Sequence, residues 1–288
     1  MTLSRITDMV TFLWLFCLML QMGSSVTTGQ LTASFRKGAV IWKGLATNLL
    51  VVPVAAFGLL LLFRPDPLIA AGFLTGVVFS GAPMGPSFTA LAKGDVPLSV
   101  GLMVILAVLT TVISPAVLKF LLAGFAQEKP LEVNYLKIMT VVILGQLLPL
   151  SAGLGLNHWR SAVVRKIAKP IRILSNLLLL GTSCLIILTH YRTLELFGWR
   201  AAVGCVVLFT ACLIIGWIMG GPHEAERKAL AFNTTIRNAP AALVVASTNF
   251  PGTVAPAAVF TYSLVSILGT LAVALFMGRQ PERQSLLT

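Results

Sequence analysis

Residues 226–249 read ERKALAFNTTIRNAPAALVVASTN, and this stretch decides how the chain is interpreted. It has the length of a membrane span, because about 20 apolar residues cross the hydrocarbon core of a bilayer. Its middle, NTTIRNAP at residues 233–240, is polar and holds a guanidinium and a helix breaker. A charged residue near the bilayer centre costs roughly 2.5–3.5 kcal/mol on insertion scales. We therefore expect a protein-lined site for a polar ligand here.

The rest of the chain has the composition of an integral membrane protein. Its 288 residues are 57% hydrophobic and 10% charged, with a mean hydropathy of +0.93, whereas about 25% of a soluble domain is charged. The net charge of +12 comes from 21 Lys and Arg against nine Asp and Glu. These basic residues lie mostly in short connections between apolar stretches, as the positive-inside rule predicts. We expect a lipid bilayer as the surroundings and no nucleic-acid partner.

The apolar stretches predict an all-α polytopic membrane protein with about nine transmembrane helices. We expect a single transmembrane transporter domain over residues 1–278 and a cytoplasmic tail over residues 279–288. The predicted spans are residues 7–26, 39–63, 68–92, 96–122, 135–156, 173–189, 199–220, 226–249 and 251–277.

Three local features refine this count. The first stretch also has the features of a signal peptide, with Arg5 as its basic residue, and the count of nine keeps it as a span. Residues 157–172 place Trp159 on an apolar side and Arg165 on a basic one, which predicts a separate interfacial helix. The four cysteines lie inside apolar stretches and are expected to be small buried hydrophobic residues; they are Cys17, Cys184, Cys205 and Cys212.

The distribution of Lys and Arg sets the orientation. Of the 21, 13 fall on the side of the C-terminus, seven fall on the opposite side and Arg237 lies within a span. The positive-inside rule therefore places the C-terminus in the cytoplasm and the N-terminus outside. The expected location is the plasma (inner) membrane.

Two of the predicted spans are broken near their middle. One break covers residues 81–87 and the other residues 233–240, and the two spans cross the membrane in opposite directions. A long span with an internal proline is expected to follow each break. This is the pattern of an inverted-repeat transporter, in which discontinuous helices meet at the midplane and form the site. The prolines concerned are Pro83 and Pro86, Pro240, Pro115 and Pro256.

Three segments carry a family resemblance that extends over essentially the whole chain. They are GAPMGPSFTALAKGDVPLSV at residues 81–100, Ser114-Pro115, and ERKALAFNTTIRNAPAALVVA at residues 226–246. These segments resemble the bile acid:sodium symporter family of secondary transporters. The resemblance implies nine or ten helices, with the N-terminus outside in the nine-helix members. It also implies a panel domain and a core domain with interleaved helices, the two unwound helices crossing in the core.

The second crossing helix departs from the family's pattern. In the family it usually reads Glu-x-Gly-Met-Gln-Asn, and the Glu and Gln help to bind two sodium ions. In this chain Asn233 stands in place of the Glu, Arg237 in place of the Gln, and Asn238 matches the Asn.

The other positions that the family uses for sodium match only in part. Asn48 stands where the family has a sodium-binding Gln five residues before a proline, and Ser99 matches a serine ligand. Met103, however, replaces the Thr ligand one turn later. At its break, the first crossing helix is about three residues shorter than in the family, and it supplies Gly85, Pro86 and Ser87 there.

Charge disfavours sodium as a coupling ion. All nine Asp and Glu fall at span ends or in loops, so no carboxylate is expected at the midplane. A guanidinium would repel a sodium ion by about 4 kcal/mol at 4 Å with an effective dielectric of 20. We expect no cofactor and no metal, and we expect Arg237 to pair with the anionic group of a substrate. The half-helix N-termini near Ala239 and Ser87 would assist it.

The predicted substrate-binding residues are Arg237, Asn238, Asn233, Thr234, Thr235, Asn48, Ser87, Gly85 and Ser99, and the predicted structural breaks are Pro83, Pro86 and Pro240. Structural roles stay open beside the functional ones. The guanidinium of Arg237 would also suit the backbone carbonyls of the other broken helix, and the amides and hydroxyls would also suit hydrogen bonds between helices.

These features predict a secondary transporter that moves a small organic anion by alternating access, with Arg237 holding the anion at the helix crossing. The alternative is a non-transporting membrane scaffold or sensor that keeps the transporter fold. We expect no enzyme, because the chain has no G-x-S-x-G, no H-E-x-x-H and no paired intramembrane aspartates.

Overall fold

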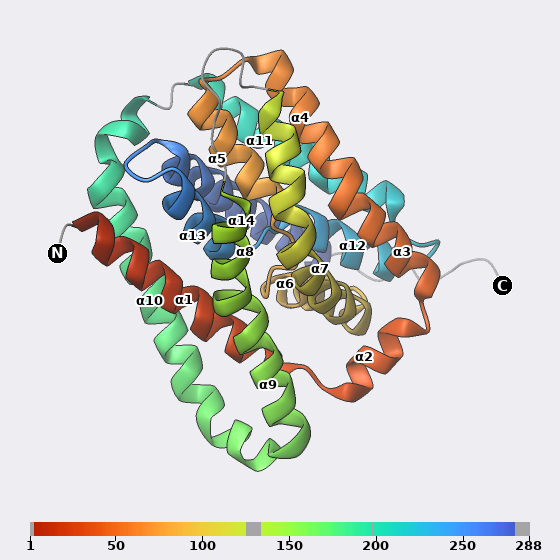
Figure 1. Cartoon of the computed structure of the whole chain (residues 1–288). Helices are drawn as coiled ribbons and strands as arrows, with labels where there is room; N and C mark the ends of the chain where they lie inside the picture. Colours follow the sequence, from red (N-terminus) through yellow and green to blue (C-terminus); the bar gives the residue numbers. More distant parts are fainter. Residues whose placement is uncertain (1–2, 125–133, 197–198, 280–288) are drawn as a thin grey trace.

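The computed structural model describes residues 3–124, 134–196 and 199–279, with the side chains of residues 190–196, 199 and 200 left out. The described residues form fourteen α-helices and two short π-helical segments, and no strand (Figure 1). Seven helical stretches are long and apolar enough to cross a membrane, which confirms the predicted all-helical polytopic membrane protein. They are α1 (Leu3–Ser25), α3–η1–α4 (Gly38–Phe63), α7 (Val96–Ala123), α8–η2–α9 (Tyr135–Trp159), α10 (Ser161–Leu196), α11 (Trp199–Met219) and α14 (Ala255–Arg279).

The third and eighth predicted spans are each a pair of short helices. The first pair is α5 (Pro67–Val78) and α6 (Gly85–Leu91), and the second is α12 (Glu224–Thr235) and α13 (Ala239–Asn249). Both breaks are therefore present, but they are shorter than predicted and fall at residues 79–84 and 236–238. An additional helix, α2 (Thr28–Phe35), lies in the connection between α1 and α3.

The prolines explain why the predicted breaks were too long. Pro86 and Pro240 lie in the first turns of α6 and α13, where the missing N–H would have no partner in the helix anyway. Pro256 likewise lies at the start of α14 and not inside it, whereas Pro115 lies inside α7 as predicted. Asn233, Thr234 and Thr235 belong to α12, and Ser87 belongs to α6.

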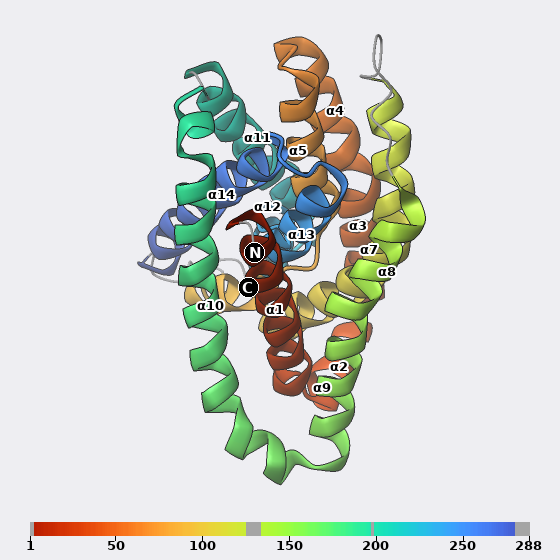
Figure 2. The same cartoon turned by 60° about the vertical axis from the view of Figure 1, so that its left-hand side comes forward.

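The predicted interfacial helix is wrong as a separate element. α9 ends at Trp159, Arg160 leaves the helical backbone (φ −138°, ψ 51°), and α10 then runs without interruption from Ser161. Pro170 lies inside α10, where it removes one hydrogen bond near the exposed Lys166 and Lys169. Figure 2 shows the joined ends of α9 and α10 projecting beyond the other helices.

The helices pack in two groups, which differ in the neighbours they prefer. α1 packs mainly against α9 and α10, and both views show the three side by side (Figures 1 and 2). We call α1, α8–η2–α9 and α10 the α1 group. The crossing group holds the two broken pairs with α3–η1–α4, α7, α11 and α14; within it, α11 packs on α12 and α14 packs on α5.

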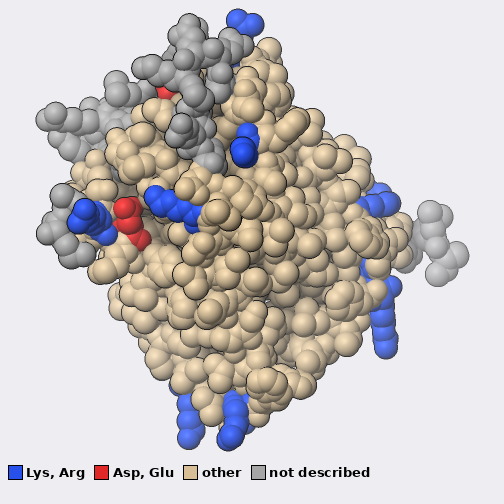
Figure 3. Space-filling view, viewed as in Figure 1, with Lys and Arg blue, Asp and Glu red and all other residues tan. Residues whose placement is uncertain are grey.

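The apolar core joins the two groups. One continuous cluster of buried side chains runs from α1 through α5, α7 and α13 to α14. Cys17, Cys205 and Cys212 are buried as predicted, but Cys184 is exposed on α10. Charged side chains lie mostly toward the margins of the face shown in Figure 3, and a broad uncharged area covers its middle.

Three helices of the crossing group are tied together by an ion-pair cluster. Lys37 precedes α3, and its Nζ lies 2.6 Å from Asp95 Oδ2 and 2.7 Å from Glu226 Oε1. Burial lowers the pKa of Lys37, but the hydrogen bonds and charges of the two carboxylates outweigh burial and raise that pKa above its ordinary value. Lys37 therefore stays charged at neutral pH and fixes the ends of α3, α7 and α12.

Candidate functional site at the helix crossing

The two helix breaks lie against each other. The backbone N–H of Asn238 donates to the carbonyl of Phe79 at 2.8 Å, which joins the second break to the first. Gly81, in the first break, has φ +80°. A Cβ at this position would lie 2.4 Å from the backbone nitrogen of Ala107 in α7. Only glycine therefore allows the first break to pass this close to α7.

At each break, the last carbonyl of the preceding short helix accepts a hydrogen bond from a hydroxyl of the following long helix. Ser114 of α7 donates to the carbonyl of Val78 at the end of α5. Ser266 of α14 donates in the same way to the carbonyl of Thr235 at the end of α12. Lipid offers no hydrogen bonds to such groups, so a side chain must supply them. Both breaks are thus stabilised in the same way, by a serine of the long helix that follows.

Removing one of these hydroxyls should destabilise the protein. Ser266→Ala is expected to lower the free energy of unfolding by about 1–3 kcal/mol, because the Thr235 carbonyl would remain buried without a partner. Ser263→Ala is the matched control: it makes the same change one turn earlier in α14, where the hydroxyl is buried and bonds to nothing among the described residues. The measurement is the thermal unfolding midpoint in detergent. An equal loss in both variants would contradict the prediction.

Two π-helical segments each place an amide side chain at the crossing. η1 (Thr47–Val51) carries Asn48 and η2 (Ile143–Leu147) carries Gln146, and both side chains are fully buried. Each segment directly precedes a helix with proline at its second residue. Because proline donates no N–H and crowds the carbonyl four residues earlier, one wider turn relieves the strain. Such π-bulges are frequent at functional sites.

The Arg237 cluster lies on one side of the second break. Arg237 Nη1 donates to Asn48 Oδ1 at 3.0 Å, and Nη2 lies 3.9 Å from the sulfur of Cys212 in α11. Asn48 Nδ2 in turn donates to the carbonyl of Gly44 and lies 3.3 Å from the hydroxyl of Thr234. Cys212 also lies 3.8 Å from the hydroxyl oxygen of Tyr262.

Arg237 is a buried cation without a carboxylate partner among the described residues. Its side chain is 4% exposed, and its Nε has no hydrogen-bond partner there. The described ion pairs of this chain involve Lys37 and Lys228 instead. A buried charge is costly unless a counter-charge or several hydrogen bonds compensate it. In the described structure, the contacts of Nη1 with Asn48 and of Nη2 with Cys212 are the compensation for this charge.

The Asn233 cluster lies near the first turn of α6. Asn233 Nδ2 donates to Ser99 Oγ at 2.6 Å and to the carbonyl of Ala229 at 2.9 Å. Thr89 also donates to Ser99, at 3.0 Å. Asn233 Oδ1 faces Gly85, where a Cβ would lie 2.9 Å from it, and this oxygen is buried without a described partner. The cluster is thus neutral and offers one free acceptor.

The Asn238 cluster lies on the side of the α1 group. Asn238 caps α13, since its Oδ1 accepts from the N–H of Ala241, and its Nδ2 donates to Gln146 Oε1 at 2.9 Å. Gln146 Nε2 donates to the carbonyl of Ala107 in α7 and lies 3.4 Å from the hydroxyl of Thr111. Both amides are fully buried.

The structure brings most of the predicted site residues together in these clusters and leaves two apart. Arg237, Asn48, Thr234, Asn233, Ser99, Gly85 and Asn238 take part. Ser87 is exposed on α6, and the hydroxyl of Thr235 bonds only to carbonyls of its own helix. No group of three or more His, Cys, Asp or Glu that could hold a metal occurs in the described part of the chain.

Sequence reasoning missed Gln146, Cys212 and Tyr262. Gln146 had a signal, since it is a lone amide in an apolar span shortly before Pro149, as Asn48 is before Pro53. Cys212 and Tyr262 look like ordinary apolar-span residues in the sequence. Only the packing of α11 and α14 brings Cys212 next to Arg237 and Tyr262 next to Cys212.

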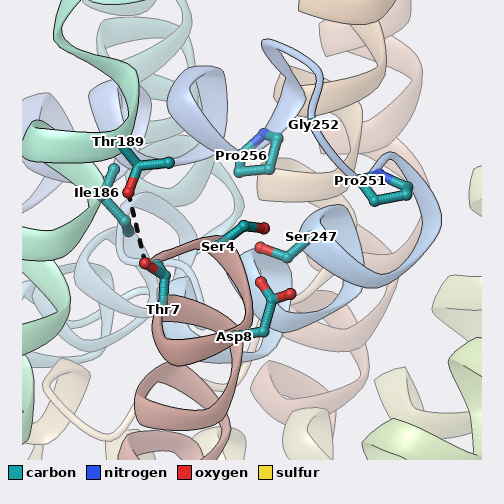
Figure 4. Close-up of a pocket in the computed structure, with 9 residues that line it drawn as sticks. All are labelled: Ser4, Thr7, Asp8, Ile186, Thr189, Ser247, Pro251, Gly252 and Pro256. Carbon is teal, nitrogen blue, oxygen red and sulfur yellow. Dashed lines mark hydrogen bonds between the residues drawn. The ribbon is translucent and has the colours of Figure 1, made fainter. Parts of the chain in front are cut away.

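A small cavity lies between the two groups at the end of the molecule where α1 begins. It has a volume of about 60 Å³ and is lined from α1 by Ser4, Thr7 and Asp8, as Figure 4 shows. α10 contributes Thr189, and the end of α13 with the following turn contributes Ser247 and Pro251. Packing between the groups is therefore incomplete next to the C-terminal end of α13.

Comparisons with known proteins agree with this architecture. The family model described as "Sodium Bile acid symporter family" matches residues 12–195. The chain is also similar to the "Probable sodium/metabolite cotransporter BASS1, chloroplastic" of Arabidopsis thaliana. The two are 24% identical over 290 residues, which cover 98% of this chain and 70% of the relative.

Proposed function

This chain belongs to the sodium bile acid symporter family and is a membrane transporter rather than an enzyme, and from this premise we propose a specific mode of transport. The protein moves a small organic anion across the membrane by alternating access. The positive charge of Arg237 holds the anion at the helix crossing. Binding of the anion does not require sodium.

The contact between Arg237 and Asn48 carries this proposal. Asn48 stands at the position of a sodium-binding Gln in the family pattern, yet its Oδ1 accepts from Arg237 Nη1 at 3.0 Å. The oxygen that would face a bound ion thus faces a permanent cation. Arginine does not lose its proton in proteins, so this charge is present in every step of the transport cycle.

The Asn233 cluster supports the same proposal. Asn233 stands in place of a glutamate, and it directs an NH₂ group toward Ser99. An NH₂ group cannot coordinate a cation. One free amide oxygen, Asn233 Oδ1, falls short of the several oxygen ligands that hard cations require. Among the described residues, this cluster also holds no carboxylate that would offset the charge of a sodium ion.

An anion would relieve the cost of burying Arg237. The guanidinium has one donor, Nε, without a described partner. Two unit charges 4 Å apart attract by about 4 kcal/mol at an effective dielectric of 20, which exceeds the contribution of a neutral hydrogen bond. A substrate with a carboxylate or sulfonate would gain this attraction, and a neutral analogue would not.

The test is a thermal-shift measurement on the purified protein with anions of two sizes. The probes are potassium pyruvate and potassium taurocholate against potassium chloride at equal ionic strength, each with and without sodium. At least one probe should raise the unfolding midpoint, because a ligand that binds only the folded state stabilises it by RT ln(1 + [L]/Kd). Sodium should not increase this shift.

Stabilisation that requires sodium would contradict the ion-independent mode. The absence of any shift over a wider panel of carboxylates and sulfonates would favour a scaffold or sensor instead. Uptake of the stabilising anion into proteoliposomes, with and without a sodium gradient, then separates binding from transport.

A further inference from the structure

Gln146 connects the α1 group to the helix crossing. It belongs to α8–η2–α9, yet the hydrogen bonds of its side chain go to the crossing group: to Asn238 at the second break and to Ala107 and Thr111 in α7. Gln146 and Asn238 are both 0% exposed, so bulk water does not compete for these hydrogen bonds.

The orientations in this chain of amides determine one another. Asn238 Oδ1 accepts from the N–H of Ala241 as the cap of α13, so its Nδ2 must point to Gln146. Gln146 therefore presents its oxygen to Asn238 and its NH₂ to the carbonyl of Ala107. As a result, the N–H of Asn238 that points toward the α1 group is already occupied in this structure.

The side chains of Arg237 and Asn238 bond on opposite sides of the second break. Arg237 contacts η1 and α11, within the crossing group, whereas Asn238 contacts η2 of the α1 group. A substrate that enters between the two groups would therefore meet Asn238 before it reaches the guanidinium of Arg237. The donor such an anion needs first is the one that Gln146 now holds.

α13 is held by the α1 group at its other end as well. Lys137 of α8 donates from its Nζ to the carbonyl of Thr248, in the last turn of α13, at 2.8 Å. This contact places a positive charge at the negative end of the helix. The cavity of Figure 4 adjoins the same end and is lined in part by Ser247. α13 is thus bonded at both ends, with room beside one of them.

We infer that Gln146 is a positioning residue for transport: its amide holds Asn238 until an anionic substrate replaces it, and this exchange releases α13 from the α1 group. The inference rests on the proposed function, since it identifies which contact the anion must replace. It assigns the substrate a hydrogen-bond acceptor, such as a carboxylate or sulfonate oxygen, that accepts from Asn238 Nδ2. Lys137 then forms a second, exposed contact that must part when the two groups move.

The first experiment measures hydrogen exchange of the α13 amides in the ligand-free protein. Gln146→Met removes the hydrogen bonds of the amide to Asn238, Ala107 and Thr111. It is expected to speed exchange over residues 239–249 about fivefold, the equivalent of the one neutral hydrogen bond to Asn238. Gln146→Glu keeps an oxygen that accepts from Asn238 but loses the NH₂ group that donates to the carbonyl of Ala107. Because the bond to Asn238 remains, exchange in α13 should stay close to wild type. Thr140→Ala is the control, because that hydroxyl bonds only within α8. Exchange in α13 that Gln146→Met leaves unchanged, or that both variants speed equally, overturns the inference.

The second experiment measures binding of potassium pyruvate and potassium taurocholate by thermal shift. Gln146→Met should bind the stabilising probe about fivefold more tightly, because the competitor for Asn238 is gone, although its maximal transport rate falls. Gln146→Glu should bind the probe more weakly, since a carboxylate at this position still accepts from Asn238 Nδ2 and also repels an anion. A residue with only a structural role would not raise affinity when removed, so weaker binding by Gln146→Met overturns the inference.

The two proposals can fail separately. If neither probe nor the wider panel stabilises the wild-type protein, the proposed function fails. The exchange experiment then still decides whether Gln146 holds α13 through Asn238.

Discussion

Arg237→Gln is expected to weaken binding of the stabilising anion by about 30-fold or more. Removing one member of a buried charge pair costs roughly 2–5 kcal/mol, and 1.4 kcal/mol corresponds to a tenfold change in affinity. Arg237 is buried and has no carboxylate partner in the described residues, so no other charge there would compensate for its loss. Glutamine keeps a neutral N–H donor at the position of Nε but ends two bonds short of Nη1, so both the charge and the bond to Asn48 Oδ1 are lost. The measurement is the dependence of the unfolding midpoint on probe concentration, with potassium as the only cation.

Two controls separate charge from geometry. Arg36→Gln makes the same change of net charge at an exposed position before α3 and should leave affinity unchanged. Arg237→Lys keeps the charge but loses the planar fork that reaches Asn48 and Cys212 together, so an intermediate loss is expected. Unchanged affinity in Arg237→Gln would show that Arg237 has a structural role only.

Gly81→Ala is expected to abolish the native packing of the first break. The left-handed backbone at φ +80° costs a residue with a Cβ about 1–2 kcal/mol, and overpacking adds about 1–3 kcal/mol. The new methyl group would lie 2.4 Å from the backbone nitrogen of Ala107 and 2.8 Å from the carbonyl oxygen of Met103. Both of these atoms belong to the backbone of α7 and cannot move aside as a side chain can. The combined loss of about 2–5 kcal/mol would be measured as a lower unfolding midpoint and a lower yield of monodisperse protein.

Gly58→Ala is the matched control for this change. Gly58 lies inside α4, and a Cβ there would meet no atom within 4 Å. Because glycine in a helix interior is less favourable than alanine by roughly 0.5–1 kcal/mol, this variant should be slightly more stable than wild type. A tolerated Gly81→Ala would contradict the close approach of the first break to α7.

The sequence was most informative where the signal is local. The polar run around Arg237 and the prolines around residues 83–86 predicted both broken helices, because a charge or a helix breaker inside an apolar span has a direct cost. The limits of the breaks were predicted less well. Pro86 and Pro240 begin helices instead of interrupting them, and a proline has the same appearance in the sequence in either case.

The residues of the candidate site were likewise predictable where the signal is local. Asn48, Asn233, Ser99, Arg237 and Asn238 could be selected from the sequence, since polar residues are rare in spans and match a family pattern. Ser87 was selected for the same reason and is exposed. The partner of Asn238 could not be derived, because Gln146 is 92 residues away in the chain and reaches the break only through the wider turn of η2.

By itself, the sequence determined that this protein lies in a membrane, that it is helical and that two of its spans are broken. Composition, hydropathy and the positions of polar residues and prolines within each span suffice for these conclusions, since the bilayer constrains every segment separately. Only the tertiary structure decided which polar groups meet. It placed Arg237 against Asn48, Asn233 against Ser99, and Gln146 between Asn238 and Ala107. The reason is that a hydrogen bond depends on a few tenths of an ångström between side chains from distant helices, and helix packing sets that distance.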